Sequence, residues 1–191
     1  EINEILAKNQ LVFLSGIGGI GKTELAKQYA YRHRTQYDTV VFAVYEKNIE
    51  SLVRDEIGIN QISCEEDETE RDYFKRKIEV LKQAATPKDL IIIDNFDVDA
   101  DEDLETLFAC PCKFIITTRK DFRDYNYEQI NVDRIKDIQE ILNLFYTYNS
   151  IPYTEKENEA VRQLIEYVEH HTMTVELIAK YLRNTEISPE I

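Results

Sequence analysis

Cysteine is scarce in this sequence, with three residues among 191. An odd and small number of cysteines argues against a disulfide framework and favours a reducing compartment. Two of them form the motif Cys110-Pro111-Cys112, but there is no second pair and no nearby histidine. We therefore interpret Cys110 and Cys112 as loop residues before a strand rather than as a metal or redox pair.

Long apolar runs and positive charge are also lacking. No apolar stretch approaches the roughly 18 residues of a membrane span, and the first residues have no signal-peptide pattern. The chain carries 23 Lys and Arg residues against 37 Asp and Glu residues, a net charge of −14. Such an acidic chain is not expected to bind nucleic acid directly or to dock on an anionic membrane. We expect a cytoplasmic protein.

Glycine is rare as well, and its distribution is uneven. Four of the five glycines fall between residues 16 and 21, in the run Gly16-Ile17-Gly18-Gly19-Ile20-Gly21-Lys22-Thr23. This spacing matches G-x-x-x-x-G-K-[ST], the loop that wraps the phosphates of a nucleotide. Phosphate oxygens require several inward-pointing backbone N–H groups, and glycine reaches the necessary backbone angles at little cost.

The loop predicts specific contacts with a nucleotide. The ammonium group of Lys22 would reach the β- and γ-phosphates, and the hydroxyl of Thr23 would hold Mg²⁺. A strand-like run precedes the loop and a run of helix formers follows it, an order that disfavours a merely flexible glycine turn. The helix would add its positive N-terminal end. The expected nucleotide-binding residues are Gly16, Ile17, Gly18, Gly19, Ile20, Gly21, Lys22, Thr23 and Glu24.

Five apolar segments predict the strands of an α/β domain, with helical patterns between them. Three of the segments are nearly continuous apolar runs, a pattern typical of parallel strands that are covered on both faces. The expected strands are residues 11–14, 39–45, 90–94, 113–117 and, more weakly, 128–132. The expected helices between them are residues 24–30, 48–57, 69–85 and 99–108.

The pattern changes after Val132, where three apolar stripes at helical spacing follow one another with no strand between them. We interpret the stripes as core positions rather than as a cofactor or partner groove. A boundary near Arg134 then gives a P-loop α/β domain at residues 1–134 and a small helical lid subdomain at residues 135–191. The stripes are Ile138, Ile141, Leu142 and Phe145; Val161, Leu164, Ile165 and Val168; and Val175, Ile178, Ala179 and Leu182.

Two strand ends carry candidate chemistry beyond the loop. Asp94 ends an apolar strand, at the edge of a parallel sheet where ligands collect, and would hold Mg²⁺ opposite Thr23. Arg119 ends the next strand, and its charge would contact the γ-phosphate or stabilise the charge that develops as the bond breaks. The alternatives are an ordinary acidic residue at a strand end and a surface arginine.

Hydrolysis also needs a group that orients or deprotonates a water molecule. Many P-loop ATPases have an acidic residue directly after the strand's aspartate, but this position is Asn95, whose amide cannot take a proton. Asp97 is a candidate substitute, with a solvated loop carboxylate as the alternative. We therefore expect slow Mg²⁺-dependent hydrolysis at most, which suits a switch better than a motor because both nucleotide states must persist.

Adenine is favoured over guanine by elimination. GTPases usually show N-K-x-D and D-x-x-G motifs, and neither is present; the segment at the metal strand is Asp94-Asn95-Phe96-Asp97. The expected cofactors are therefore ADP or ATP with Mg²⁺. His170 and His171 end a predicted helix, where capping or surface roles are favoured over contact with a nucleotide.

Three segments together resemble the STAND ATPases of the NB-ARC type, the nucleotide switches of plant resistance proteins, animal apoptosome scaffolds and many bacterial sensors. These segments are residues 16–26, 90–97 and 114–119, the last ending in Thr-Thr-Arg. Residues 141–145 and 174–179 resemble later helices of the family, so the likeness extends from residue 10 to residue 183.

The resemblance implies a P-loop NTPase three-layer sandwich whose five-stranded parallel sheet has the order 5-1-4-3-2, followed by a helical lid. It implies that ADP holds a closed state and that ATP lets the protein open and often oligomerise. It also implies winged-helix, sensor and effector domains in the same longer chain. We accordingly expect a nucleotide-binding fragment of a bacterial-type sensor or regulator.

The chain departs from the family pattern at two places. The Gly-x-Pro segment that usually touches base and ribose is Thr172-Met173-Thr174 here, and the upstream segment that often lies against adenine is expected to be missing. Two other functions stay open: a scaffold that binds nucleotide without significant hydrolysis, and a P-loop kinase for a small molecule. The kinase would need an arginine-rich lid, whereas Arg134, Arg162 and Arg183 are widely spaced.

Overall fold

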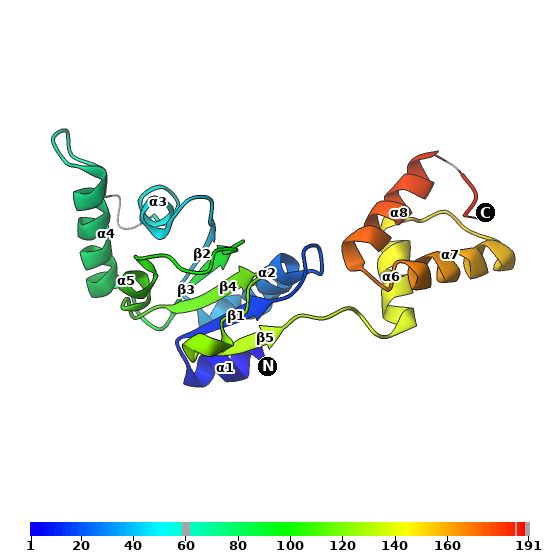
Figure 1. Ribbon diagram of the computed structural model, residues 1–191, viewed down its shortest axis with the longest axis horizontal. Helices are drawn as coiled ribbons and strands as arrows, with labels where there is room; N and C mark the ends of the chain where they lie inside the picture. Colours follow the sequence, from blue (N-terminus) through cyan, green and yellow to red (C-terminus); the bar gives the residue numbers. More distant parts are fainter. Residues whose placement is uncertain (59–61, 186, 190–191) are drawn as a thin grey trace. The chain divides into compact units, whose positions relative to one another are not determined.

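A computed structural model describes residues 1–58, 62–185 and 187–189 of the chain (Figure 1). The chain divides into two compact units. The first consists of residues 1–16 and 22–131, and the second of residues 17–21 and 132–191. Residues 186, 190 and 191 of the predicted helical subdomain lie outside the described residues.

The first unit contains a five-stranded parallel sheet among the described residues, with the order β2-β3-β4-β1-β5. This order is the predicted 5-1-4-3-2 counted from the other edge, so the predicted P-loop α/β fold is confirmed. The strands are β1 (Leu11–Ser15), β2 (Thr39–Val44), β3 (Asp89–Asp94), β4 (Lys113–Thr118) and β5 (Gln129–Asn131).

Two helices of the first unit begin at capping side chains. Asn48 and Thr69 accept hydrogen bonds from the backbone N–H groups of Ser51 and Asp72 and so cap α3 and α4. The helices are α1 (Ile2–Lys8), α2 (Lys22–Arg32), α3 (Ile49–Asp55), α4 (Glu70–Ala84) and α5 (Leu104–Phe108), with short 3₁₀ turns η1 (Arg34–Gln36) and η2 (Arg123–Tyr125). The sequence did not predict α1, and α5 is shorter than the predicted 99–108.

Successive side chains of the central strands point to opposite faces of the sheet, and both faces are covered. One set packs in a single cluster with apolar residues of α3, α4 and α5, and comprises Phe13, Ile91, Ile93, Phe114 and Ile116. The alternate set is also buried, and comprises Val12, Leu14, Leu90, Ile92 and Ile115. Among the helices, α1 contacts β1, α2 contacts β4, and α3 contacts α4 (Figure 1). Burial on both faces explains the continuous apolar runs of β1, β3 and β4.

The edge strand β2 differs from β1, β3 and β4 because one of its faces is exposed. Val40, Phe42 and Val44 share one face and are 42%, 36% and 41% exposed. An edge strand has a neighbour on one side only, and among the described residues β2 pairs only with β3. The Lys27 ammonium lies 4.8 Å from the centre of the Phe42 ring and covers part of this face.

The second unit contains α6 (Ile138–Tyr148), α7 (Glu155–Tyr167) and α8 (Thr172–Thr185), and α6 contacts both of the others (Figure 1). A capping box of Thr154 and Glu157 begins α7. The three predicted stripes form the core of this unit: eight of their twelve residues are buried, Ile138, Val168 and Ile178 are partly buried and pack against these, and Leu164 is also only partly buried. The buried residues are Ile141, Leu142, Phe145, Val161, Ile165, Val175, Ala179 and Leu182. No helix of the described residues is long and apolar enough to cross a membrane.

The three cysteines lie in contrasting surroundings. All are free thiols; Cys64 is exposed, whereas Cys110 and Cys112 are fully buried in the core of the first unit. Burial raises the pKa of the Cys110 thiol to about 11 and that of Cys112 to about 12. Since the thiolate is the nucleophile, the two buried thiols are both shielded and protonated at neutral pH.

Thiol titration should therefore distinguish one cysteine from the other two. In the folded chain at pH 8, we expect Ellman's reagent to modify one thiol rapidly, and to modify three after guanidinium unfolding. The variant Cys64→Ser should show no rapid reaction. Rapid modification of two or more thiols in the folded chain would contradict the burial of the Cys-Pro-Cys segment.

Candidate functional site

Strand register gathers the polar strand ends of the first unit at one edge of the sheet. Ile93 of β3 pairs with Ile116 of β4, and Ser15 of β1 pairs with Thr118 of β4. Asp94 and Thr117, which follow Ile93 and Ile116, therefore lie side by side. This is the carboxyl edge of a parallel sheet, where ligands bind in open α/β folds.

The carboxylate of Asp94 is held by two hydroxyl groups. Its Oδ1 accepts a hydrogen bond from Thr23 at 2.7 Å and another from Thr117 at 2.6 Å. Thr23 lies in the first turn of α2, so this carboxylate connects the end of β3 both to the helix after the glycine loop and to β4. The oxygens of Thr23 and Asp94 are hard donors of the kind that Mg²⁺ prefers.

The residues present fit a magnesium ion that phosphate oxygens complete. The described residues contain no group of three or more His, Cys, Asp or Glu side chains that could form an all-protein metal cage. Mg²⁺ is usually bound by one or two carboxylates together with substrate phosphates, rather than by such a cage. The pair formed by Thr23 and Asp94 meets this requirement.

Thr117 also fixes the backbone that follows Asp94. Its hydroxyl accepts a hydrogen bond from the N–H of Asn95 at 2.9 Å, and its carbonyl accepts one from the N–H of Phe96 at 2.9 Å. Asn95 has a φ of +67°, in the left-handed region that asparagine enters more easily than most residues. Phe96 is fully buried and anchors the turn. Thr117 is thus a site residue that sequence reasoning did not single out, although a polar residue in an apolar strand beside Asp94 was a signal.

Lys22 lies in a mixed electrostatic environment. Its side chain is buried, and Nζ donates a hydrogen bond to the carbonyl of Gly16 at 2.8 Å. Burial lowers the pKa of the Lys22 ammonium, and the charge of Arg119 lowers it further, while the carboxylates of Asp97 and Asp94 act in the opposite direction. The predicted residues Lys22, Asp94, Asp97 and Arg119 are therefore within electrostatic reach of one another.

Asp97 and Arg119 form an ion pair at the ends of β3 and β4. Oδ1 of Asp97 accepts a hydrogen bond from the backbone N–H of Arg119 at 2.6 Å, and Oδ2 lies 3.1 Å from its Nε. The Arg119 side chain is 61% exposed and that of Asp97 is 26% exposed. The guanidinium is thus accessible to a ligand, and the carboxylate is occupied by arginine.

Residues 17–21 of the loop contact the start of α8 within the second unit. His171 Nε2 donates a hydrogen bond to the carbonyl of Gly18 at 2.9 Å. The Thr172 hydroxyl and the Met173 N–H donate to the carbonyl of Gly19 at 2.7 and 3.2 Å. These contacts use carbonyl oxygens, whereas anion binding by such a loop uses its N–H groups.

Two glycines of the loop are required by its conformation. Gly19 has a φ of +72°, and a Cβ atom added there would lie 2.8 Å from atoms of the Met173 side chain. Gly21 has a φ of +108° with open space around it, so its backbone angle alone excludes other residues.

The remaining predicted residues are dispersed. Ile17 is 51% exposed and Ile20 is buried. Glu24 is exposed in the first turn of α2, where its carboxylate accepts a hydrogen bond from Gln28 at 3.2 Å. His170, with a φ of +59°, places Nδ1 2.9 Å from the carbonyl of Ile135, which is a local structural role.

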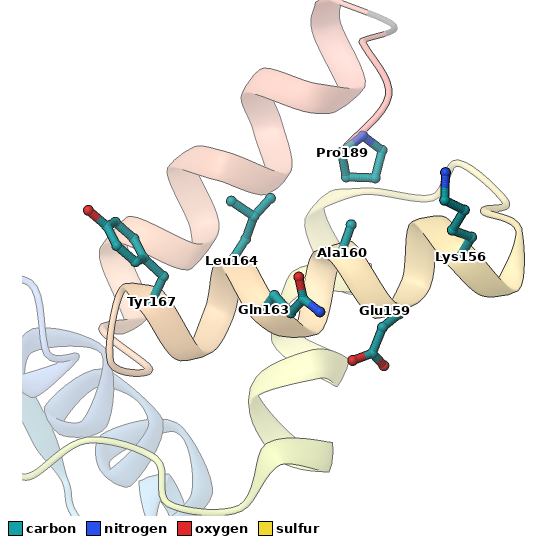
Figure 2. A pocket seen from close by; sticks show the side chains of 7 residues that line it. All are labelled: Lys156, Glu159, Ala160, Gln163, Leu164, Tyr167 and Pro189. Atoms are coloured by element: carbon teal, nitrogen blue, oxygen red, sulfur yellow. The ribbon is translucent and has the colours of Figure 1, made fainter. Parts of the chain in front are cut away.

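A cavity of 630 Å³ lies in the second unit, along α7 (Figure 2). The side chains of Ala160 and Leu164 point toward the segment that carries Pro189 (Figure 2). The cavity contains neither a residue of the glycine loop nor one of the strand ends, and its polar side chains do not converge on one point. Its lining residues are Lys156, Glu159, Ala160, Gln163, Leu164, Tyr167 and Pro189.

The role of Thr117 can be tested by stability. We expect Thr117→Val to lower the free energy of unfolding by about 2 kcal/mol, because two hydrogen bonds of about 1 kcal/mol each are lost at a buried position. Thr117→Ser keeps the hydroxyl and should lose about 0.8 kcal/mol for one methyl group. Chemical denaturation measures both values. A valine variant as stable as the unaltered chain would show that the hydroxyl does not hold the strand ends.

In a comparison with protein-family models, the NB-ARC domain matches residues 1–140. A search of curated proteins finds no match. The matched segment includes the glycine loop, both strand ends and the whole parallel sheet, and it covers well over half of the 191 residues. NB-ARC proteins are nucleotide-binding signalling ATPases that form part of multidomain chains. The chain therefore belongs to the NB-ARC domain family.

Proposed function

We propose that the chain is an adenine-nucleotide switch that binds ADP and ATP with Mg²⁺ and hydrolyses ATP slowly. The observation that carries the proposal is the convergence of two cations and the paired oxygens of Thr23 and Asp94 at the carboxyl edge of the sheet. Family membership supports nucleotide binding, and the motif spacing supports the phosphate loop at Gly16–Thr23.

Each residue then has one task. Backbone N–H groups of residues 16–24 bind the phosphates, and Lys22 neutralises the β- and γ-phosphates. Thr23 and Asp94 hold Mg²⁺, which when bound neutralises phosphate charge that develops during cleavage. Arg119 contacts the γ-phosphate, so that only the triphosphate engages both cations. Burial of Lys22 strengthens its attraction to phosphate, because the local dielectric is lower than in water.

Hydrolysis depends on how water is activated. Asn95 follows Asp94 in a fixed left-handed turn, and its amide can orient a water molecule without removing a proton. Asp97 is the candidate base, and this role requires its ion pair with Arg119 to open. Both features support slow turnover and hence two long-lived nucleotide states.

Adenine is proposed because both guanine-specific motifs are absent from the sequence. At the departure Thr172-Met173-Thr174, Thr172 and Met173 donate to the loop carbonyl of Gly19. We propose that in this chain the segment links the loop to the helical subdomain. The full-length protein would carry winged-helix, sensor and effector domains and would oligomerise in response to ATP in the cytoplasm.

The phosphate grip can be tested at Lys22. We expect Lys22→Ala to weaken binding of ADP and ATP by about tenfold or more, because a charge-assisted hydrogen bond contributes about 1.5–3 kcal/mol. Fluorescent nucleotide titration measures this loss.

Lys27→Ala is a matched control, since it removes one positive charge from the same helix at an exposed position. It should bind nucleotide normally. Equal affinities of the unaltered chain, Lys22→Ala and Lys27→Ala would refute the phosphate loop. Tight binding of GDP but not ADP would refute the choice of adenine.

The lack of a carboxylate directly after Asp94, where it could act as general base for hydrolysis, can be tested at Asn95. Aspartate is nearly isosteric with asparagine and tolerates the same left-handed backbone, so Asn95→Asp should keep the fold. We expect steady-state phosphate release from ATP to rise about tenfold or more, because a positioned general base contributes typically about 10²–10⁴. Asp94→Ala should abolish any turnover.

The two alternative functions give different results in the same assay. Nucleotide binding with no phosphate release above background, in both the unaltered chain and Asn95→Asp, would indicate a scaffold. Transfer of labelled phosphate to an added metabolite would indicate a kinase.

A further inference from the structure

In the ion pair of Asp97 and Arg119, backbone hydrogen bonds hold the acceptor, Asp97, in place. The N–H of Asp97 donates to the carbonyl of Asn95 at 2.9 Å, which tightens the left-handed turn after β3. The N–H of Phe96 is bound to Thr117 of β4, and the Phe96 ring is buried. The backbone therefore aims the Asp97 carboxylate at the end of β4, where it accepts from the N–H of Arg119 at 2.6 Å.

The arginine side of the pair is exchangeable. The Asp97 carboxylate lies 3.1 Å from Nε of Arg119, and no other ion pair to this guanidinium occurs among the described residues. The guanidinium is planar with five donors, so an anion that binds it through two of them can draw Nε away from the carboxylate. At 61% exposure, such a pair contributes only about 0–1 kcal/mol, and a phosphate can compete for the arginine.

The pair also lies where a terminal phosphate would act. Asp97 and Arg119 both influence the ammonium of Lys22, with opposite signs. A phosphate held by Lys22 is therefore attracted by the guanidinium and repelled by the carboxylate. The diphosphate lacks the terminal group and is affected less by either charge.

We propose that Asp97 is a positioning residue that holds Arg119 at the strand ends and competes with the terminal phosphate of ATP for it, which lowers the affinity for ATP relative to ADP. The inference rests on the proposed function and deepens it, because it assigns the discrimination between the two nucleotides to one ion pair. Release of Asp97 by an arriving γ-phosphate also frees the carboxylate that hydrolysis requires.

The variant Asp97→Asn tests the competition. Its amide oxygen can still accept from the N–H of Arg119, while the negative charge is removed. We expect the affinity for a non-hydrolysable ATP analogue with Mg²⁺ to rise about 2–5-fold, the equivalent of a surface ion pair, and the affinity for ADP to stay unchanged. Isothermal titration calorimetry gives both constants. Asp97→Ser is a second uncharged variant with a hydroxyl acceptor, should the amide disturb folding.

Matched controls separate the effect of the Asp97–Arg119 ion pair from the effect of removing any nearby negative charge. Asp99→Asn removes a carboxylate two residues away that pairs with Lys120 at 2.8 Å, and it should leave the ATP-to-ADP affinity ratio unchanged. Asp97→Glu keeps the charge and should keep the ratio close to that of the unaltered chain. In an Arg119→Gln background, Asp97→Asn should no longer raise the ratio, because the arginine for which phosphate competes is gone.

Several outcomes would overturn the inference. An unchanged or lower ATP-to-ADP ratio in both uncharged variants would exclude competition by Asp97, and an undiminished rise in the Arg119→Gln background would exclude action through the arginine. If both nucleotides bind in a Lys22-dependent way and the ratio does not respond, only this inference fails. If the unaltered chain binds neither nucleotide, the proposed function fails with it.

Discussion

The hydrogen bonds that converge on one oxygen of Asp94 hold the candidate site together. Thr23 and Thr117 both donate to this oxygen, and in doing so they connect α2, β3 and β4. Thr117 in turn fixes the turn at Asn95, and that turn directs Asp97 toward Arg119. A carboxylate at a strand end thus sets the positions of groups that lie far apart in the sequence. A parallel sheet makes such positioning possible, because neighbouring strands end at the same edge.

The sequence was sufficient to predict features that depend on local pattern. The glycine loop and the apolar runs of β1, β3 and β4 are each encoded within a few residues. The stripes of α6 to α8 could be predicted because helical spacing is regular and their burial follows from it. Even the sheet order was available, although only through resemblance to a family.

Other features depend on contacts that no local pattern encodes. The partner of Thr117 lies 23 residues earlier in the chain, and the partner of Asp97 lies 22 residues later, so sequence reasoning found neither pair and did not single out Thr117. Sequence reasoning named Asp97 as a candidate for water activation but did not reveal that its carboxylate is paired with Arg119. Helix α1 was missed because seven residues give too short a stripe to distinguish from a loop. The apolar composition of β2 did not reveal that the strand lies at an edge.

The exposed face of β2 connects the net negative charge of the chain with its resistance to aggregation. Val40, Phe42 and Val44 form a row of apolar side chains on a strand that has no neighbour on its outer side in the part of the chain that the structure describes. Such a strand is a template for edge-to-edge aggregation, and natural proteins blunt it with charge. With Lys27 as the nearby cation over this face, the net charge of −14 keeps copies of the chain apart in solution. Colloidal stability therefore depends on pH. As carboxylates become protonated, the repulsion between molecules weakens, and the edge strand β2 becomes a site at which they can associate.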